Sequence, residues 1–332
     1  MTHPVRWGIL STALIGTEKV IPAMRKSGAL GVAAIASRDL SAAQAAAAKF
    51  GIATAYGTYE APLADPTIEA IYNPLPNHLH IPWTLAAAQA GKHVLCEKPM
   101  AMRAAELDVL RPFASKVHIR EAFMVRHHPQ WKAVREQVRA GAIGELRYIQ
   151  VPFSYFNDDP ANIRNRADVG GGALYDIGCY AIAAGRWFHE REPERVVCAV
   201  DRDPALGTDR TVSAVLDFGS GRQLGFTVST QSVRYQRVQL VGTKGRIEIE
   251  IPFNAPQGAA SRYLIDTGAV DGSGIRSVTL PDADHYQLQA EAFSRAVREE
   301  APAASGLDDA AANMRVVDAL FASERSGKFE RP

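Results

Sequence analysis

The sequence has few cysteines, almost no net charge and no long apolar run, and each shortage excludes a class of protein. Its three cysteines, Cys96, Cys179 and Cys198, stand far apart and form no C-x-x-C pair, so neither a disulfide framework nor a zinc ribbon is expected. A formal net charge of +1 gives no field to attract nucleic acid. No stretch approaches the ~20 apolar residues of a membrane helix. The first residues lack the regions of a signal peptide, so we expect a cytoplasmic protein.

The length points to two domains. A chain of 332 residues is too long for one ordinary core, because single cores stop growing near ~250 residues. We expect an NAD(P)-binding domain over residues 1–122 and a second domain over residues 123–332, with the last helix returning toward the first domain.

The first ~120 residues alternate short apolar runs with helical patterns. The runs are apolar on both faces, which is typical of a parallel sheet covered on both sides. This region is therefore expected to form an α/β, doubly wound Rossmann domain. The expected strands are 5–10, 32–36, 70–72, 93–96 and 117–122, and the expected helices are 17–26, 41–50, 78–90 and 104–115.

The pattern changes after a helix expected over residues 131–139. Strand candidates joined by short turns predict an α+β domain with a large, mostly antiparallel open sheet. These strands are 146–156, 195–200, 211–218, 223–230, 234–241 and 246–251. Residues 254–274 are rich in Gly, Ala and Ser and are expected to be loop, and two helices, 286–299 and 306–326, close the chain.

A dinucleotide fingerprint belongs directly after the first strand. The segment there reads Ser11, Thr12, Ala13, Leu14, Ile15, Gly16, so only the last glycine of G-x-G-x-x-G is kept. Ser11 and Ala13 are small enough for backbone amides to approach a pyrophosphate. We predict that this loop binds the cofactor; an unrelated strand-turn-helix is the alternative.

The end of the second strand indicates which dinucleotide is bound. An NAD site usually places a carboxylate there for the ribose hydroxyls, whereas this chain has Ser37 and Arg38. A hydroxyl followed by a guanidinium suits a 2′-phosphate, which arginine can hold by charge-assisted bonds. We therefore expect NADP, with NAD possible and with Arg38 as a solvated surface charge being the alternative.

Three further segments make the chain resemble the Gfo/Idh/MocA oxidoreductases, the family of glucose-fructose oxidoreductase and inositol dehydrogenases. They are Tyr72-Asn73-Pro74-Leu75-Pro76-Asn77-His78-Leu79-His80, Cys96-Glu97-Lys98-Pro99, and the stretch from Gly170 to Tyr180. The resemblance covers nearly the whole chain and is closest to the branch of dimeric dihydrodiol dehydrogenases and some xylose dehydrogenases. In many members a histidine stands at the position of Tyr180, so the proton donor expected here is a phenol.

Two of these segments follow strands of the Rossmann sheet, where ligands bind in doubly wound folds. The prolines make both loops stiff enough for a nicotinamide ring to rest on, unless they merely end the strands. We expect cofactor contacts from Asn73, Pro74, Leu75, Pro76, Asn77, His80, Glu97, Lys98 and Pro99.

Asp176 and Tyr180 stand four residues apart on a helical pattern and so project from one face. We expect Tyr180 to handle the proton, Lys98 to lower the pKa of that phenol, and Asp176 to bind a substrate hydroxyl. Helix capping by Asp176 and core filling by Tyr180 are the alternative. Arg126 and Asn165 are further candidates for substrate binding.

No metal site is expected. His127 and His128 could be grouped with His78 and His80, but adjacent histidines point in different directions and no carboxylate stands at ligand spacing.

Together these features predict an NAD(P)-dependent oxidoreductase that moves a hydride to or from a sugar, cyclic polyol or diol. A nucleotide-sensing protein without turnover, and a dehydrogenase of a non-sugar diol or dicarbonyl, are the alternatives. An open sheet with a free face also suggests a homodimer or homotetramer formed through the second domain.

Overall fold

A computed structural model describes residues 3–298 and 306–332. The chain divides into two compact units. The first comprises Met1–Met124 and Asp284–Ala311, and the second comprises Val125–Ala283 and Ala312–Pro332.

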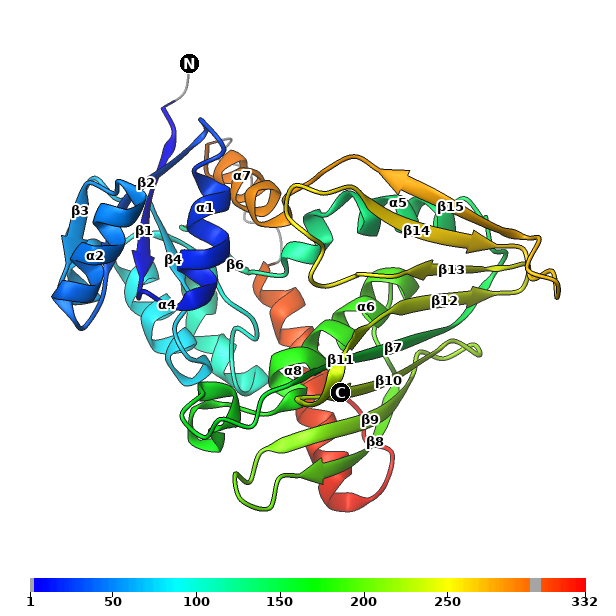
Figure 1. Cartoon of the computed structure of the whole chain (residues 1–332). Coiled ribbons are helices and arrows are strands. Elements are labelled where there is room, and N and C mark those ends of the chain that lie inside the picture. The colour runs from blue at the N-terminus through cyan, green and yellow to red at the C-terminus, as the bar shows by residue number, and fades with distance from the viewer. Residues whose placement is uncertain (1–2, 299–305) are drawn as a thin grey trace. The chain divides into compact units, whose positions relative to one another are not determined.

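The first unit is built on a parallel six-stranded sheet of order β3-β2-β1-β4-β5-β6 (Figure 1). The order reverses at β1, as in doubly wound folds, so the predicted Rossmann domain is confirmed. Its central strands are largely buried because both faces are covered, which explains their mostly apolar sequence; Arg6 is the exposed residue of β1. The strands are β1 (Val5–Leu10), β2 (Leu30–Ala36), β3 (Thr54–Tyr56), β4 (Ala70–Asn73), β5 (His93–Cys96) and β6 (Ile119–Glu121).

Short helical segments connect these strands, and one helix from late in the chain also belongs to this unit. That helix, α7, packs against β1, where Trp7 contacts Phe293 with ring centroids 5.2 Å apart and Trp7 Nε1 donates to Ser294 Oγ at 3.2 Å. The connecting segments are a π-helical η1 (Ile15–Val20), α1 (Ile21–Met24), α2 (Leu40–Phe50), α3 (Glu60–Ala64), η2 (Asn77–Leu79), α4 (His80–Gln89) and a 3₁₀-helical η3 (Ala104–Phe113); α7 spans His285–Arg298.

The second unit holds a nine-stranded sheet of order β15-β14-β13-β12-β7-β10-β9-β8, with β11 also pairing with β7. All its pairs are antiparallel except β7 with β10, so the mostly antiparallel sheet is confirmed. The strands are β7 (Leu146–Phe156), β8 (Arg195–Arg202), β9 (Asp209–Asp217), β10 (Gln223–Ser229), β11 (Gln231–Gln236), β12 (Val238–Gly242), β13 (Arg246–Ile249), β14 (Ser261–Asp266) and β15 (Ile275–Leu280).

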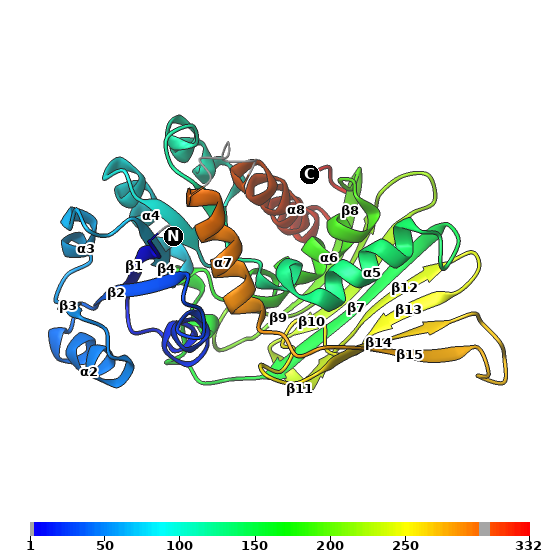
Figure 2. The same ribbon diagram turned by 90° about the horizontal axis from the view of Figure 1, so that it is seen from above.

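Helices cover one face of this sheet (Figure 2). They are α5 (Pro129–Arg139) and α6 (Cys179–His189), with the second-unit part of α8 (Gly306–Ser326) bonded to β8. Trp131 of α5 and Phe188 of α6 stack in the core beneath, with centroids 5.3 Å apart. Along β7, Ile149, Val151 and Phe153 are buried, whereas Tyr148 and Gln150, which alternate with them, are exposed. The alternation shows a sheet with one packed face and one open face.

Several local predictions were wrong. Residues 254–274 are not loop throughout, since they contain β14, and both β15 and the short β3 were missed. The strand expected over 234–241 is divided between β11 and β12 at Arg237. Glu299, expected to end the penultimate helix, lies outside the described residues. No helix in the described ranges is long and apolar enough to cross a membrane.

Candidate active site

The loop after β1 is a tight turn tied to the neighbouring strand. Ser11 has a left-handed φ of 76°, its amide donates to the Ala36 carbonyl at 2.8 Å, and its hydroxyl accepts from the Ala13 amide at 3.2 Å. A Cβ added to Gly16 would lie 3.8 Å from Pro74, an ordinary contact. The packing of the protein therefore does not require glycine at this position, which leaves the approach of a ligand as its reason.

The end of β2 presents a cation and no available carboxylate. Ser37 is buried and its hydroxyl accepts from the Asp39 amide at 3.1 Å, while Arg38 is exposed. Asp39 is a carboxylate close to the position that binds ribose in NAD sites. However, its Oδ1 accepts from the amide of Ser41 at 2.9 Å and from the Ser41 hydroxyl at 2.7 Å, which caps α2. The residues here suit a phosphate better than a pair of ribose hydroxyls.

The loop after β4 is held by two buried side chains. Asn73 Nδ2 donates to the His80 carbonyl at 3.2 Å, and Asn73 Oδ1 accepts from the Leu75 amide. The ring nitrogens of His80 lie 2.6 Å from the Leu75 carbonyl and 2.7 Å from the Pro99 carbonyl. His80 thus joins the loop after β4 to the loop after β5. Both side chains are buried and bonded inside the protein, so they shape these loops, and the predicted cofactor contacts of Asn73 and His80 stay predictions.

Burial affects the charge of His80. It lowers the pKa of the ring to about 4, against the opposite effect of the two carbonyls, and the nearby Lys98 charge lowers it further.

The loop after β5 carries the E-K-P segment. Tyr72, on β4, donates its hydroxyl to Glu97 Oε1 at 2.7 Å, and the Lys98 amide donates to Glu97 Oε2 at 3.3 Å. Tyr286 of α7 is buried nearby, and burial together with the Glu97 charge raises its pKa. The Glu97 carboxylate is therefore fixed beside Lys98, whose side chain is partly exposed at the carboxyl end of the sheet. Pro74, Leu75, Pro76 and Asn77 lie at the same edge.

In the second unit, Asp176 is held by two groups that sequence reasoning did not find. Tyr155, near the end of β7, donates its hydroxyl to Asp176 Oδ2 at 2.5 Å, and Arg164 Nε donates to the same oxygen at 3.1 Å. The Asp176 charge raises the pKa of the Arg164 guanidinium. Burial, followed by the Asp176 charge, raises the pKa of the Tyr155 phenol well above its ordinary value. The phenol therefore stays protonated and donates.

Tyr180 stands one helical turn beyond Asp176, on the segment formed by the π-helical η7 (Leu174–Gly178) and α6. Its ring packs against Phe153 and Phe253, with centroids 6.1 and 5.5 Å away. Tyr180 also contributes, as the smallest of several causes, to the raised pKa of Arg164. One helical segment therefore carries a carboxylate held by an arginine and, four residues further on, a phenol.

The two remaining substrate candidates have other surroundings. Asn165 is 2% exposed, and its Nδ2 donates to the carbonyls of Asn157 at 3.3 Å and Asp159 at 2.8 Å. This side chain holds its own loop together, and its predicted substrate contact stays a prediction. Arg126 lies with its guanidinium carbon 5.7 Å from the Trp187 ring centroid.

Tyr155 and Arg164 left no readable signal in the sequence. They stand 21 and 12 residues before Asp176, on β7 and on the short 3₁₀ helix η5 (Ile163–Asn165), and only the fold brings them to Asp176. Within the described ranges, no group of three or more His, Cys, Asp or Glu residues is arranged to hold a metal ion.

Comparison with known proteins agrees with this geometry. Residues 5–127 match the oxidoreductase family model with a NAD-binding Rossmann fold, and residues 131–248 match the GFO/IDH/MocA C-terminal domain. An uncharacterised oxidoreductase of Rhizobium meliloti is 46% identical over 98% of both chains. The D-xylose 1-dehydrogenase (NADP(+)) 2 of Haloferax volcanii is 39% identical over 97% of this chain and 98% of its own.

Among solved structures, a 3-ketoreductase from Actinomadura kijaniata in complex with NADP and TDP-benzene superposes with a TM-score of 0.89. It is 29% identical and covers 96% of this chain and 98% of its own. The chain therefore belongs to the GFO/IDH/MocA family and is an NAD(P)-dependent oxidoreductase.

Proposed function

We propose that this oxidoreductase interconverts an alcohol and a carbonyl of a sugar, cyclic polyol or related diol, with NADP as its preferred cofactor. The observation that carries the proposal is the Tyr155–Asp176–Arg164 cluster beside Tyr180. A carboxylate held by a phenol and a guanidinium has a fixed direction, which suits it to bind a substrate hydroxyl. This substrate class is supported by two relatives, the D-xylose 1-dehydrogenase of Haloferax volcanii and a dTDP-3,4-didehydro-2,6-dideoxy-alpha-D-glucose 3-reductase of Actinomadura kijaniata.

In the proposed site the loops of the first unit hold the cofactor. Ser11, Thr12, Ala13, Leu14, Ile15 and Gly16 take the pyrophosphate, and Ser37 and Arg38 take the 2′-phosphate. Pro74, Leu75, Pro76, Asn77, Glu97, Lys98 and Pro99 line the nicotinamide end. When bound, NADP supplies or accepts the hydride.

The proton is handled by the chain itself. Tyr180 donates it to the carbonyl oxygen during reduction and accepts it during oxidation. The Lys98 ammonium stabilises negative charge on that oxygen and on the phenolate. Asp176 orients a neighbouring hydroxyl, with Arg126 as a further substrate contact. We also propose that residues 1–122 act as the cofactor domain and residues 123–332 as the substrate domain, apart from α7, which packs in the first unit.

A spectrophotometric assay tests it. Purified protein is given NADPH or NADP with a panel of aldoses, keto sugars, cyclic polyols and diols of an aromatic ring, and with NADH or NAD in parallel. We expect turnover with at least one hydroxyl-rich compound and higher efficiency with NADP(H). Tight NADPH binding without turnover of any compound would favour the nucleotide-sensing alternative.

We also propose a homodimer, or a homotetramer built from it, through the open face of the nine-stranded sheet. Tyr148 of β7 and Val215 of β9 are exposed on that face at 42% and 40%. Pairing two such faces would cover them. Light scattering on the wild type and on Val215→Glu tests this, since the variant should shift toward the monomer. Cytoplasmic location is proposed as well, because buried Cys96 and Cys179 are free thiols suited to a reducing compartment.

A further inference from the structure

The helix that carries Asp176 and Tyr180 begins at a buried carboxylate from another part of the second unit. Asp209, the first residue of β9, is 2% exposed, and its Oδ2 accepts from the Leu174 amide at 2.6 Å. Leu174 opens the helical segment that runs through η7 and α6 to His189. The first amides of a helix have no partner within the helix, and a carboxylate there is favoured by the helix dipole.

The glycine loop before this helix is fitted closely to that carboxylate. A Cβ added to Gly172 would lie 2.0 Å from Asp209 Oδ1, and one added to Gly171 would lie 2.6 Å from the Arg164 carbonyl. The Gly172 amide also donates to the Arg164 carbonyl at 2.8 Å. The position of Asp209 therefore constrains both the start of the helix and the segment that carries Arg164. The glycines permit this approach because they lack side chains.

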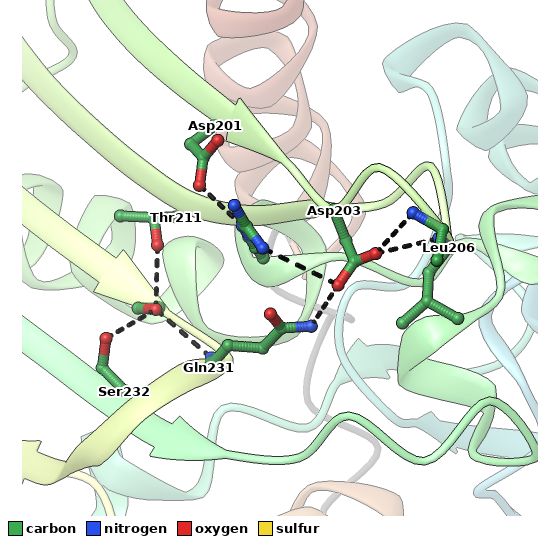
Figure 3. A network of polar contacts seen from close by, with 9 residues as sticks. Asp201, Asp203, Leu206, Thr211, Gln231 and Ser232 are labelled. Atoms are coloured by element: carbon green, nitrogen blue, oxygen red, sulfur yellow. Dashed lines mark hydrogen bonds and ion pairs between the residues drawn. The ribbon is translucent and has the colours of Figure 1, made fainter.

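The turn before Asp209 is itself fixed by a polar network (Figure 3). Asp203 accepts from the amides of Ala205 and Leu206 at 2.8 and 3.0 Å and from Gln231 Nε2 at 2.7 Å. The Asp203 amide donates to the Thr208 carbonyl at 2.9 Å, which closes the turn directly before Asp209. These bonds connect the hairpin of β8 and β9 to β11, so the backbone that carries the Asp209 carboxylate is held in place.

We infer that Asp209 is a positioning residue for the proposed reaction: by capping this helix it fixes the places of Asp176 and Tyr180. The inference rests on the proposed roles of those two residues. Asp209 itself touches neither of the reacting groups, and its effect passes through the backbone between Gly172 and Tyr180.

The capping of this helix by Asp209 depends on pH, because the Asp209 carboxylate can be protonated. Burial raises the pKa of Asp209 to about 6, and the charge of Glu324 on α8 raises it further. Hydrogen bonds from the Leu174 and Asp209 amides lower this pKa, and so does the Arg202 charge. Cys198 of β8 is also near, since the Asp209 charge contributes to the raised pKa of that thiol. Arg202 and Glu324 form a pair at 2.7 and 2.8 Å. Below about pH 6 the carboxylate becomes a carboxylic acid, which keeps an acceptor oxygen for the Leu174 amide but no longer interacts as a charge with the helix dipole.

Three variants test the inference. Asp209→Ala removes the cap; Asp209→Asn keeps an acceptor oxygen but no charge. Asp201→Asn is the matched control, because Asp201 is an exposed carboxylate on the neighbouring strand that pairs with Arg210 at 2.7 Å. Hydrogen exchange over residues 174–180, kcat between about pH 5 and 8, and NADPH affinity are measured for each.

We expect Asp209→Ala to speed exchange over residues 174–180 and to lower kcat, each by roughly 10-fold or more, with NADPH affinity changed less than about twofold. Asp209→Asn resembles the protonated acid, so it should keep most of the protection and should show at every pH the lower kcat that the wild type shows below about pH 6, without a fall near that pH. Asp201→Asn should match the wild type. If Asp209→Ala does not fold, the pH profile of Asp209→Asn decides.

The inference is overturned if exchange and kcat of the Asp209 variants match those of Asp201→Asn, or if NADPH affinity falls as much as kcat. A wild type that turns over no substrate would contradict the proposed function instead, and the exchange data would still decide whether Asp209 caps the helix.

Discussion

The hydroxyl of Tyr155 donates a 2.5 Å hydrogen bond to the carboxylate of Asp176. Because Arg164 donates to the same oxygen, Asp176 is fixed in direction before any substrate arrives. This preorganisation is what a residue that orients a substrate hydroxyl needs.

Tyr155→Phe should therefore weaken substrate orientation. Hydrogen bonds to charged groups contribute ~1.5–3 kcal/mol, so we expect kcat/KM for the substrate to fall by roughly 10-fold or more. NADPH affinity should not change, since Tyr155 is remote in sequence from every cofactor loop and lies in the second unit. Steady-state kinetics check this, with Tyr148→Phe, at an exposed tyrosine of the same strand, as the control. An equal fall in kcat/KM in both variants would show that Tyr155 has no specific role in orienting the substrate.

The choice of cofactor should depend on Arg38. Arg38→Ala removes a charge-assisted contact to the 2′-phosphate, and we expect the efficiency with NADPH to fall by ~10-fold or more while that with NADH stays unchanged. Asp39→Ala is the companion variant: it removes the cap of α2 and should lower the free energy of unfolding by about 1 kcal/mol without altering the preference for NADPH. A wild type that prefers NADH would refute the assignment of Arg38.

Gly16→Ala separates folding from binding. The neighbours of the added Cβ are at ordinary distances, so the variant should unfold within a few degrees of the wild type. We expect NADPH affinity to fall by about 10-fold or more, because the methyl group obstructs the backbone approach to the pyrophosphate. Thermal melts with and without NADPH check both statements. Unchanged affinity would mean that the cofactor does not pass over this loop.

Stability should fall in mild acid. Burial is the main cause that lowers the pKa of His80, His93 and His189 to about 4 each. A histidine in the unfolded chain titrates near ~6.5. Each of these neutral histidines therefore contributes to the free energy of unfolding above that pH, and its contribution is lost as the pH falls toward 4. For buried His80 and His189 it amounts to at most about 3 kcal/mol each. Asp209, with its raised pKa, partly opposes this loss.

Urea unfolding between about pH 7.5 and 5 measures this loss. His189→Gln is the informative variant, because Gln can still donate to the Gln223 carbonyl that His189 contacts at 3.1 Å but does not titrate. We expect a smaller loss of stability on acidification than in the wild type. An unchanged pH dependence would show that His189 is not a source of it.

The sequence predicted the Rossmann domain, the open sheet, the family and the enzyme class, because these depend on local patterns and motifs. Strands such as Val5–Leu10 are apolar on both faces and stand before recognisable loops. By contrast, β14 (Ser261–Asp266) was missed because it lies in a stretch rich in Gly, Ala and Ser, where alternation over six residues is too short to see.

The candidate site was only partly predictable. The Asp176 and Tyr180 pair follows from helical spacing, and Lys98 follows from a motif. Arg164 is 12 residues from Asp176 in the sequence, and Asp209 is 35 residues from Leu174. At these separations no local sequence pattern identifies either residue as part of the site. The side chains of Asn73, His80 and Asn165 hold their own loops together, so polar residues in motif loops can serve the loop itself, and ligand contacts at these three positions stay predictions.

Tyr180 is proposed to handle the proton, and the kcat of Tyr180→Phe tests this role. General acid/base groups contribute ~10²–10⁴-fold, so kcat should fall by about 10² or more with NADPH affinity unchanged. Lys98→Met should behave similarly, and the double variant should cost much less than the product of the two, because both groups serve one proton. Tyr235→Phe, at an exposed tyrosine of β11, controls for loss of a phenol. A Tyr180→Phe enzyme with near-wild-type kcat would contradict the account and return Tyr180 to the core.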